Sequence, residues 1–151
     1  MASREVSSLD VGQAYFELHH QLRRTVDTTM AAAGLTLARA KVLMHLSDEG
    51  PINQATLASL LGFAPRSVTD TVDALERDGL VTRAGCPNDR RARLVALTPA
   101  GVEASEHAAV ARVKAMEELF GSLSATDRAT LLNLITKIRT NLPSGDTSYV
   151  N

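Results

Sequence analysis

Residues 54–98 constrain the fold of this chain more than any other segment. Their apolar spacing predicts two short helices, Gln54–Leu61 and Pro65–Asp78, with a tight turn at Gly62 between them. Asn53 can cap the first helix, and proline suits the first turn of the second because its missing N–H costs nothing there. Two helices joined by so short a turn predict a helix-turn-helix.

A basic hairpin is expected directly after these helices. Leu80–Arg83 and Arg93–Leu97 read as short strands, joined by the tip Cys86–Arg91. Residues 83–93 hold four arginines against Asp89 alone and so carry a charge of +3, although the whole chain carries −1. The order predicts a winged helix-turn-helix, whose second helix can enter a major groove of DNA while the hairpin reaches backbone or minor groove.

Long amphipathic helices are expected on both sides of this lobe. Apolar residues recur every three or four positions over Leu9–Ala33, and a shorter helix, Leu37–Ser47, follows Gly34. Thr98 and Pro99 restart helix, and the last helix, after Ser124, ends near Leu142. The predicted class is therefore mostly α with a small β-hairpin wing.

These elements divide one domain, residues 1–151, into two functional parts. Residues 36–98 are the expected DNA-binding lobe, and residues 9–33 and 99–142 the expected dimerisation region. The apolar stripes of the flanking helices are too long for the lobe to cover, and such helices usually find a partner chain. A two-fold dimer places two recognition helices about one DNA turn apart and favours a near-palindromic site.

Several classes of protein are disfavoured. A single cysteine excludes an intrachain disulfide, and the polar start and short apolar runs favour a cytoplasmic protein without a membrane span. The sequence shows no phosphate-binding glycine loop and no nucleophile motif, so no enzyme and no cofactor are expected. The four histidines lack the spacing of a metal site.

The chain resembles the MarR family of bacterial transcription regulators along nearly its whole length. Four stretches in matching order carry the likeness: Gly34–Thr36 before Val42-Leu43, Gln54–Gly62, Ser67–Val81 and Asp89–Gly101. The resemblance implies an obligate homodimer with a triangular outline. It also implies a regulator that usually represses nearby genes and often releases DNA when a small aromatic or phenolic molecule binds.

The second helix of the motif supplies the expected base-reading residues. Arg66, Ser67, Thr69 and Asp70 fall in its first turns, where side chains reach base edges, and Arg77 is a further candidate for DNA contact. Asp70 departs from the family pattern, because a carboxylate is repelled by phosphates. It must accept from cytosine N4–H or pair with Arg66, and we favour the pair.

The wing must supply most of the phosphate attraction, because the recognition helix is acidic. Arg90 and Arg91 are the expected contacts to backbone or minor groove. The resemblance assigns Asp89 as the brace that orients an arginine, with Arg91 the inserted residue. The alternative is an ordinary solvated loop.

An effector pocket is harder to predict, because shape rather than motif defines it. Tyr15, His19, Met44, His45 and Phe63 could line a cleft with aromatic faces and a polar handle, although core packing is the better interpretation of each residue alone.

Alternatives to a ligand-responsive repressor remain open. The regulator could lack an effector, act as an activator, or respond to oxidants through Cys86, whose neighbouring arginines could lower its pKa. A winged module that binds proteins and no longer binds DNA is a further alternative. Only the acidic recognition helix favours it.

Overall fold

Helices dominate the computed structural model, and one small antiparallel sheet completes it. The structure describes the backbone of residues 5–86 and 89–142 and the side chains of residues 5–85 and 93–142. This architecture confirms the predicted fold class. The elements in chain order are α1 (Ser8–Ala32), α2 (Leu37–Glu49), β1 (Ile52–Asn53), α3 (Gln54–Leu61), α4 (Pro65–Arg77), β2 (Val81–Cys86), β3 (Asp89–Leu97), α5 (Pro99–Phe120) and α6 (Ala125–Asn141).

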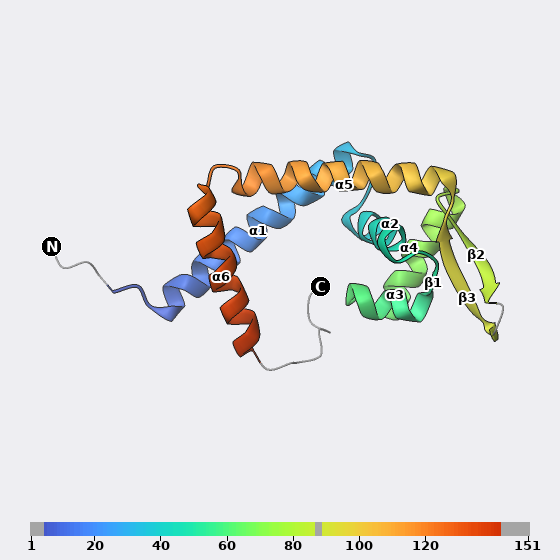
Figure 1. Ribbon diagram of the computed structural model, residues 1–151, viewed down its shortest axis with the longest axis horizontal. Helices are drawn as coiled ribbons and strands as arrows, with labels where there is room; N and C mark the ends of the chain where they lie inside the picture. Colours follow the sequence, from blue (N-terminus) through green and yellow to red (C-terminus); the bar gives the residue numbers. More distant parts are fainter. Residues whose placement is uncertain (1–4, 87–88, 143–151) are drawn as a thin grey trace.

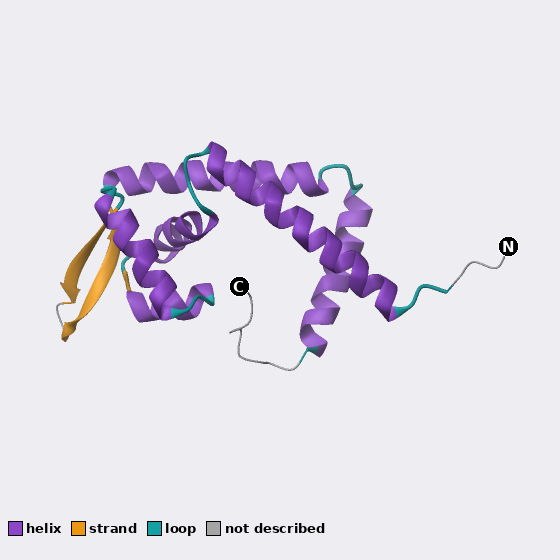
Figure 2. Ribbon diagram, turned by 180° about the vertical axis from the view of Figure 1, so that it is seen from behind, coloured by secondary structure: helices purple, strands orange, loops and turns teal. Residues whose placement is uncertain are grey.

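The molecule is elongated, with the hairpin and α6 near opposite ends (Figure 1). Helix α5 runs between them and packs against both α1 and α2. Helices α2, α3 and α4 gather beside the sheet and form the winged lobe with it, as the view from behind also shows (Figure 2). Helix α5 therefore connects the wing, at one end of the molecule, to α6 at the other.

Local capping explains why the helix-turn-helix begins and turns where the sequence predicts. The Asn53 side chain accepts a hydrogen bond from the Thr56 amide at 2.8 Å, which fixes the start of α3. Gly62 ends that helix in the left-handed region, at φ 65°, where a side chain would be strained. Pro65 then occupies the first turn of α4.

The wing differs from its prediction in length and in strand number. Strands β2 and β3 extend through most of the expected tip, so the loop predicted over Cys86–Arg91 is wrong apart from residues 87–88, which lie outside the described residues. Strand β1, which was not predicted, pairs with β3 through Ile52–Val95 and Asn53–Leu94. Ladder hydrogen bonds need no apolar side chains, so hydrophobic spacing missed these residues.

Most of the core lies in the winged lobe, and helices α1 and α5 add a few small or flexible side chains to it. Leu43, Leu57, Leu75 and Val95 are fully buried and come from α2, α3, α4 and β3. Helix α6 has no buried residue. Among the described residues, no helix has the length and apolar character that a membrane crossing requires.

Candidate nucleic-acid interface

Helix α4 presents one face to the core and another to solvent. Val68, Val72 and Leu75 recur at helical spacing and are fully buried. This packing leaves Arg66, Ser67, Asp70 and Arg77, all predicted to contact DNA, exposed on the outer side. Ala64, at the N-cap position, forms no side-chain cap, so the first amides of the helix are not occupied by a capping residue.

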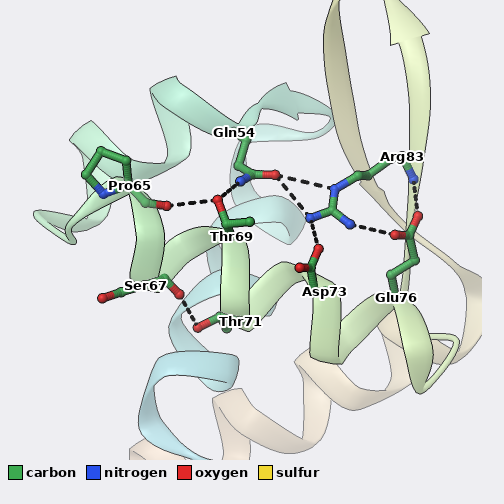
Figure 3. Close-up of polar contacts among 8 residues, drawn as sticks. All are labelled: Gln54, Pro65, Ser67, Thr69, Thr71, Asp73, Glu76 and Arg83. Carbon is green, nitrogen blue, oxygen red and sulfur yellow. Dashed lines mark hydrogen bonds and ion pairs between the residues drawn. The ribbon is translucent and has the colours of Figure 1, made fainter.

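Thr69 differs from the other predicted contacts because its hydroxyl is already engaged within the protein. It donates to the Pro65 carbonyl at 3.0 Å and accepts from Gln54 Nε2 at 2.5 Å (Figure 3). In this structure the hydroxyl therefore ties α4 to α3, and its contact with DNA stays a prediction. The residue is half-buried.

Arg83, on β2, points toward α4 and connects three elements (Figure 3). Its Nη1 lies 2.6 Å from Glu76 Oε2 and its Nη2 2.5 Å from Asp73 Oδ1. Nε and Nη2 donate to Gln54 Oε1 at 3.4 and 3.2 Å, and the Arg83 amide donates to Glu76 Oε1 at 3.2 Å. We call Gln54, Asp73, Glu76 and Arg83 the Arg83 cluster.

The Arg83 side chain is only 13% exposed, so its charge is largely withdrawn from solvent. Burial acts to lower the pKa of the guanidinium, but hydrogen bonds and charge interactions with Asp73 and Glu76 outweigh it and raise the pKa above its ordinary value. The cluster therefore holds a permanent cation. Arg83 belongs to the formal charge of +3 over residues 83–93, but its guanidinium is paired with Asp73 and Glu76.

Arginine pairs also remove most of the apparent acidity of the recognition helix. Arg83 holds Asp73 and Glu76, and Arg39 of α2 pairs with Asp78, the residue at the C-cap position of α4. The expected Arg66–Asp70 pair is not formed, and both side chains are exposed among the described residues. Asp70 is thus the carboxylate of α4 left facing solvent without an ion pair in the described structure.

Strand alternation could have revealed this role for Arg83. Val81, two residues earlier on β2, is buried, and the cross-strand partner of Arg83 is the buried Val95. Residues two apart on a strand, and residues opposite each other across a ladder, share a face. Arg83 therefore had to point toward the core and find carboxylate partners there.

Apart from residues 87–88, which lie outside the described residues, the tip of the wing is described through its backbone alone. Asp89, Arg90 and Arg91 lie in the first half of β3, and Cys86 ends β2. Their side chains lie outside the described residues, so the proposed brace and the inserted arginine remain predictions. Arg93, further along β3, is exposed.

Comparison with known proteins identifies the family. The MarR family profile matches residues 35–92. A relative in Bacillus subtilis, the uncharacterized HTH-type transcriptional regulator YdgJ, is 30% identical over 112 residues, which cover 74% of this chain and 68% of the relative. The chain belongs to the MarR family.

Solved structures of other family members share the fold. A mutant MarR from E. coli complexed with operator DNA is 28% identical, with a TM-score of 0.76 over 88% of this chain and 94% of that one. Sco3205 from Streptomyces coelicolor, in complex with DNA, is 23% identical with a TM-score of 0.79, over 94% and 93%. The MarR assignment confirms the prediction of a transcription regulator rather than an enzyme.

The five residues predicted for an effector cleft of this MarR-family chain fall into two groups. Tyr15 and His19 stack on the exposed surface of α1, with ring centroids 5.9 Å apart. Met44 and Phe63 pack against the core, and the half-buried His45 follows Met44 on α2. The Lys41 ammonium lies 5.3 Å from the centre of the Phe63 ring.

None of these residues lines either of two surface cavities in the described part of the chain. One cavity, of about 490 Å³, lies between α1 and α5, and the other, of about 370 Å³, between α5 and α6. Among the described residues, no three histidine, cysteine or carboxylate side chains gather as a metal site would require. The cleft therefore remains a prediction from sequence.

Proposed function

We propose that this MarR-family chain is a homodimeric repressor that binds a near-palindromic DNA operator and leaves it when a small aromatic or phenolic ligand binds. Residues 36–98 form the DNA-binding lobe, and residues 9–33 and 99–142 the dimerisation region of one domain. The dimer acts in the cytoplasm.

The exposed face of α4 carries this proposal. Arg66, Ser67 and Arg77 stand free on it, while Arg83 holds Asp73 and Glu76. An arginine at the start of a recognition helix can form two hydrogen bonds to guanine, and a serine hydroxyl can serve bases or phosphates. The E. coli MarR variant solved with operator DNA has a similar fold, which supports DNA as the partner.

Uncovered apolar surface supports the homodimer. Helices α1, α5 and α6 expose large apolar side chains that the chain itself does not bury, and contiguous patches of this kind mark interfaces. A second copy would cover them with equivalent surfaces around a two-fold axis. These exposed apolar side chains are Leu9, Val11, Phe16 and Leu18 of α1, Val110, Val113 and Met116 of α5, and Leu132, Leu134, Ile135 and Ile138 of α6.

The stacked Tyr15 and His19 support a ligand response. Their rings offer an aromatic face and a polar group to a phenolate or carboxylate. In a dimer, the partner's helices would supply the remaining walls of such a cleft. Oxidation of Cys86 is the alternative trigger.

Selection of binding sites from random duplex DNA tests the proposal directly. We expect two inverted half-sites with centres about ten base pairs apart. Binding that never discriminates between sequences would overturn the proposed operator, and the absence of all DNA binding would favour a protein-binding module. Repression of a reporter promoter that carries the selected site tests the direction of regulation, and activation would contradict it.

Release from the selected site tests the trigger. A panel of phenols and aromatic carboxylates should dissociate the complex, and the Tyr15→Ala variant should need more ligand. If peroxide releases the wild type but not the Cys86→Ser variant, and no ligand releases either, redox sensing replaces ligand binding.

A further inference from the structure

The Arg83 cluster joins every part of the winged lobe that would meet DNA. Arg83 lies on the wing strand β2, and Gln54 is the first residue of α3. Asp73 and Glu76 lie on α4. Gln54 also donates to Thr69, so the network continues to the first turns of α4. One guanidinium thus fixes the wing, the first helix of the motif and the recognition helix to one another (Figure 3).

The same guanidinium changes the charge of the DNA-facing lobe. Without it, Asp73 and Glu76 would stand unpaired and about half exposed on α4, the helix that the proposed function places against DNA. Unscreened carboxylates at that position oppose phosphate binding. With Arg83 in place, each carboxylate has an ion-pair partner within 2.6 Å.

We propose that Arg83 is a positioning residue for DNA recognition: it neutralises Asp73 and Glu76 and holds the wing against α3 and α4, without touching DNA itself. This inference rests on the proposed function. It assigns Arg83 a different role from the exposed arginines, because all three guanidinium nitrogens are engaged within the protein.

Arginine is required here by geometry as well as by charge. Its planar group directs donors from Nε, Nη1 and Nη2 toward three side chains from two helices at once. A lysine ammonium carries the same charge but is a compact donor on a flexible stem, and it cannot span the same acceptors. The Arg83→Lys variant should therefore recover only part of the function.

A double-mutant cycle separates this role from direct contact with DNA. Affinity for the selected site is measured for the wild type, Arg83→Met, Asp73→Asn/Glu76→Gln and the variant combining all three changes. We expect Arg83→Met to weaken binding at least about tenfold when the carboxylates are present, and less than about threefold when they are amides. A residue that contacts DNA itself would lose the same factor in both backgrounds.

Arg93→Met is the matched control, because Arg93 is an exposed arginine on the adjoining strand of the same wing. Its effect on affinity, whatever its size, should be the same in both backgrounds. Thermal unfolding of each variant sets a common temperature at which all are folded. If Arg83→Met does not fold, the cycle is run with Arg83→Lys, where we expect the same direction of coupling.

The outcomes separate this proposal from the function on which it rests. If the wild type binds its site and Arg83→Met costs the same factor in affinity with the carboxylates as with the amides, the positioning role is wrong. DNA binding then stands. If the wild type binds no DNA, the proposed function fails and the role of Arg83 in recognition fails with it.

Discussion

At the scale of single residues, internal bonds decide which polar groups of α4 remain available. The Thr69 hydroxyl and two of the helix carboxylates are engaged within the lobe, whereas Arg66, Ser67 and Asp70 are not paired in the described structure. Sequence position placed all of these residues on one helix. It could not separate the engaged groups from the free ones, because their partners lie on α3 and β2.

Asp70→Asn should raise affinity for DNA of arbitrary sequence by about two- to tenfold at low salt, because it removes a carboxylate that repels phosphate. Discrimination between the selected site and a scrambled duplex should fall if Asp70 accepts from a cytosine amine. Titrations on both duplexes at two salt concentrations measure this. Glu103→Gln on α5 is the control, and equal weakening on both duplexes by Asp70→Asn would contradict the prediction.

Arg66→Ala should lower affinity for the selected site by about 1–3 kcal/mol and change non-specific binding much less, because a base contact is lost. Arg77→Ala, at the other end of α4, should weaken both kinds of binding alike, as loss of a phosphate contact does. Competition with scrambled DNA distinguishes the two. Equal losses on all sequences for Arg66→Ala would mean that Arg66 only positions the helix.

At the scale of elements, local signals predicted helices better than strands. Helix α3 has the predicted bounds, because Asn53 and Gly62 fix its ends within the segment itself. Strand β1 holds two residues, too few for any periodicity, and its existence depends on β3, some forty positions away in the chain. The extra length of β2 and β3 likewise depends on pairing between strands rather than on apolar side chains.

The junction between wing and α5 depends on a close approach at Gly101. A Cβ added there would lie 1.9 Å from the Leu80 carbonyl oxygen, and Thr98 secures the same corner by donating to the Gly79 carbonyl at 2.7 Å. Gly101→Ala must therefore push α5 away from the end of α4. The sequence predicts that this glycine lies in the first turn of a helix, but it does not predict the contact with the Leu80 carbonyl.

Gly101→Ala should reduce the free energy of unfolding by about 1–3 kcal/mol, because the added methyl group meets backbone that cannot move aside freely. Chemical denaturation measures the loss. Gly85→Ala in β2, where an added Cβ meets nothing within 4 Å, is the control and should change stability by less than about 0.5 kcal/mol. Equal stability of the two variants would show that the backbone around Gly101 adjusts at no cost, and it would contradict the prediction.

At the scale of the whole molecule, the core and the exposed apolar surface are separated. The fully buried large side chains belong mainly to the winged lobe, whereas α6 buries nothing within the chain. The apolar stripes predicted helices on both sides of the winged lobe. Only the structure shows that α6 does not fold back to cover α1. In the proposed homodimer, a second chain would cover that surface.

Ile138→Asp should leave the protomer folded and raise the dissociation constant of the dimer at least about a hundredfold. Ile138 is 56% exposed in the single chain, so the charge is costly only where a partner covers it. Sedimentation at several concentrations measures this. Leu60 on α3 has a similar exposure of 51%, and Leu60→Asp should leave the dimer intact. A wild type that sediments as a monomer would contradict the arrangement.

The Arg83 cluster has a consequence for attempts to redirect this regulator to a new operator. Recognition helices are often treated as separable parts that can be transplanted between relatives. Here α4 is held by Gln54, which precedes it and donates to Thr69, and by Arg83, which follows it and pairs with Asp73 and Glu76. A transplanted helix lacking acidic residues at the positions of Asp73 and Glu76 would leave Arg83 buried without a counter-charge. The smallest exchangeable piece is therefore residues 54–83, from the start of α3 into the wing.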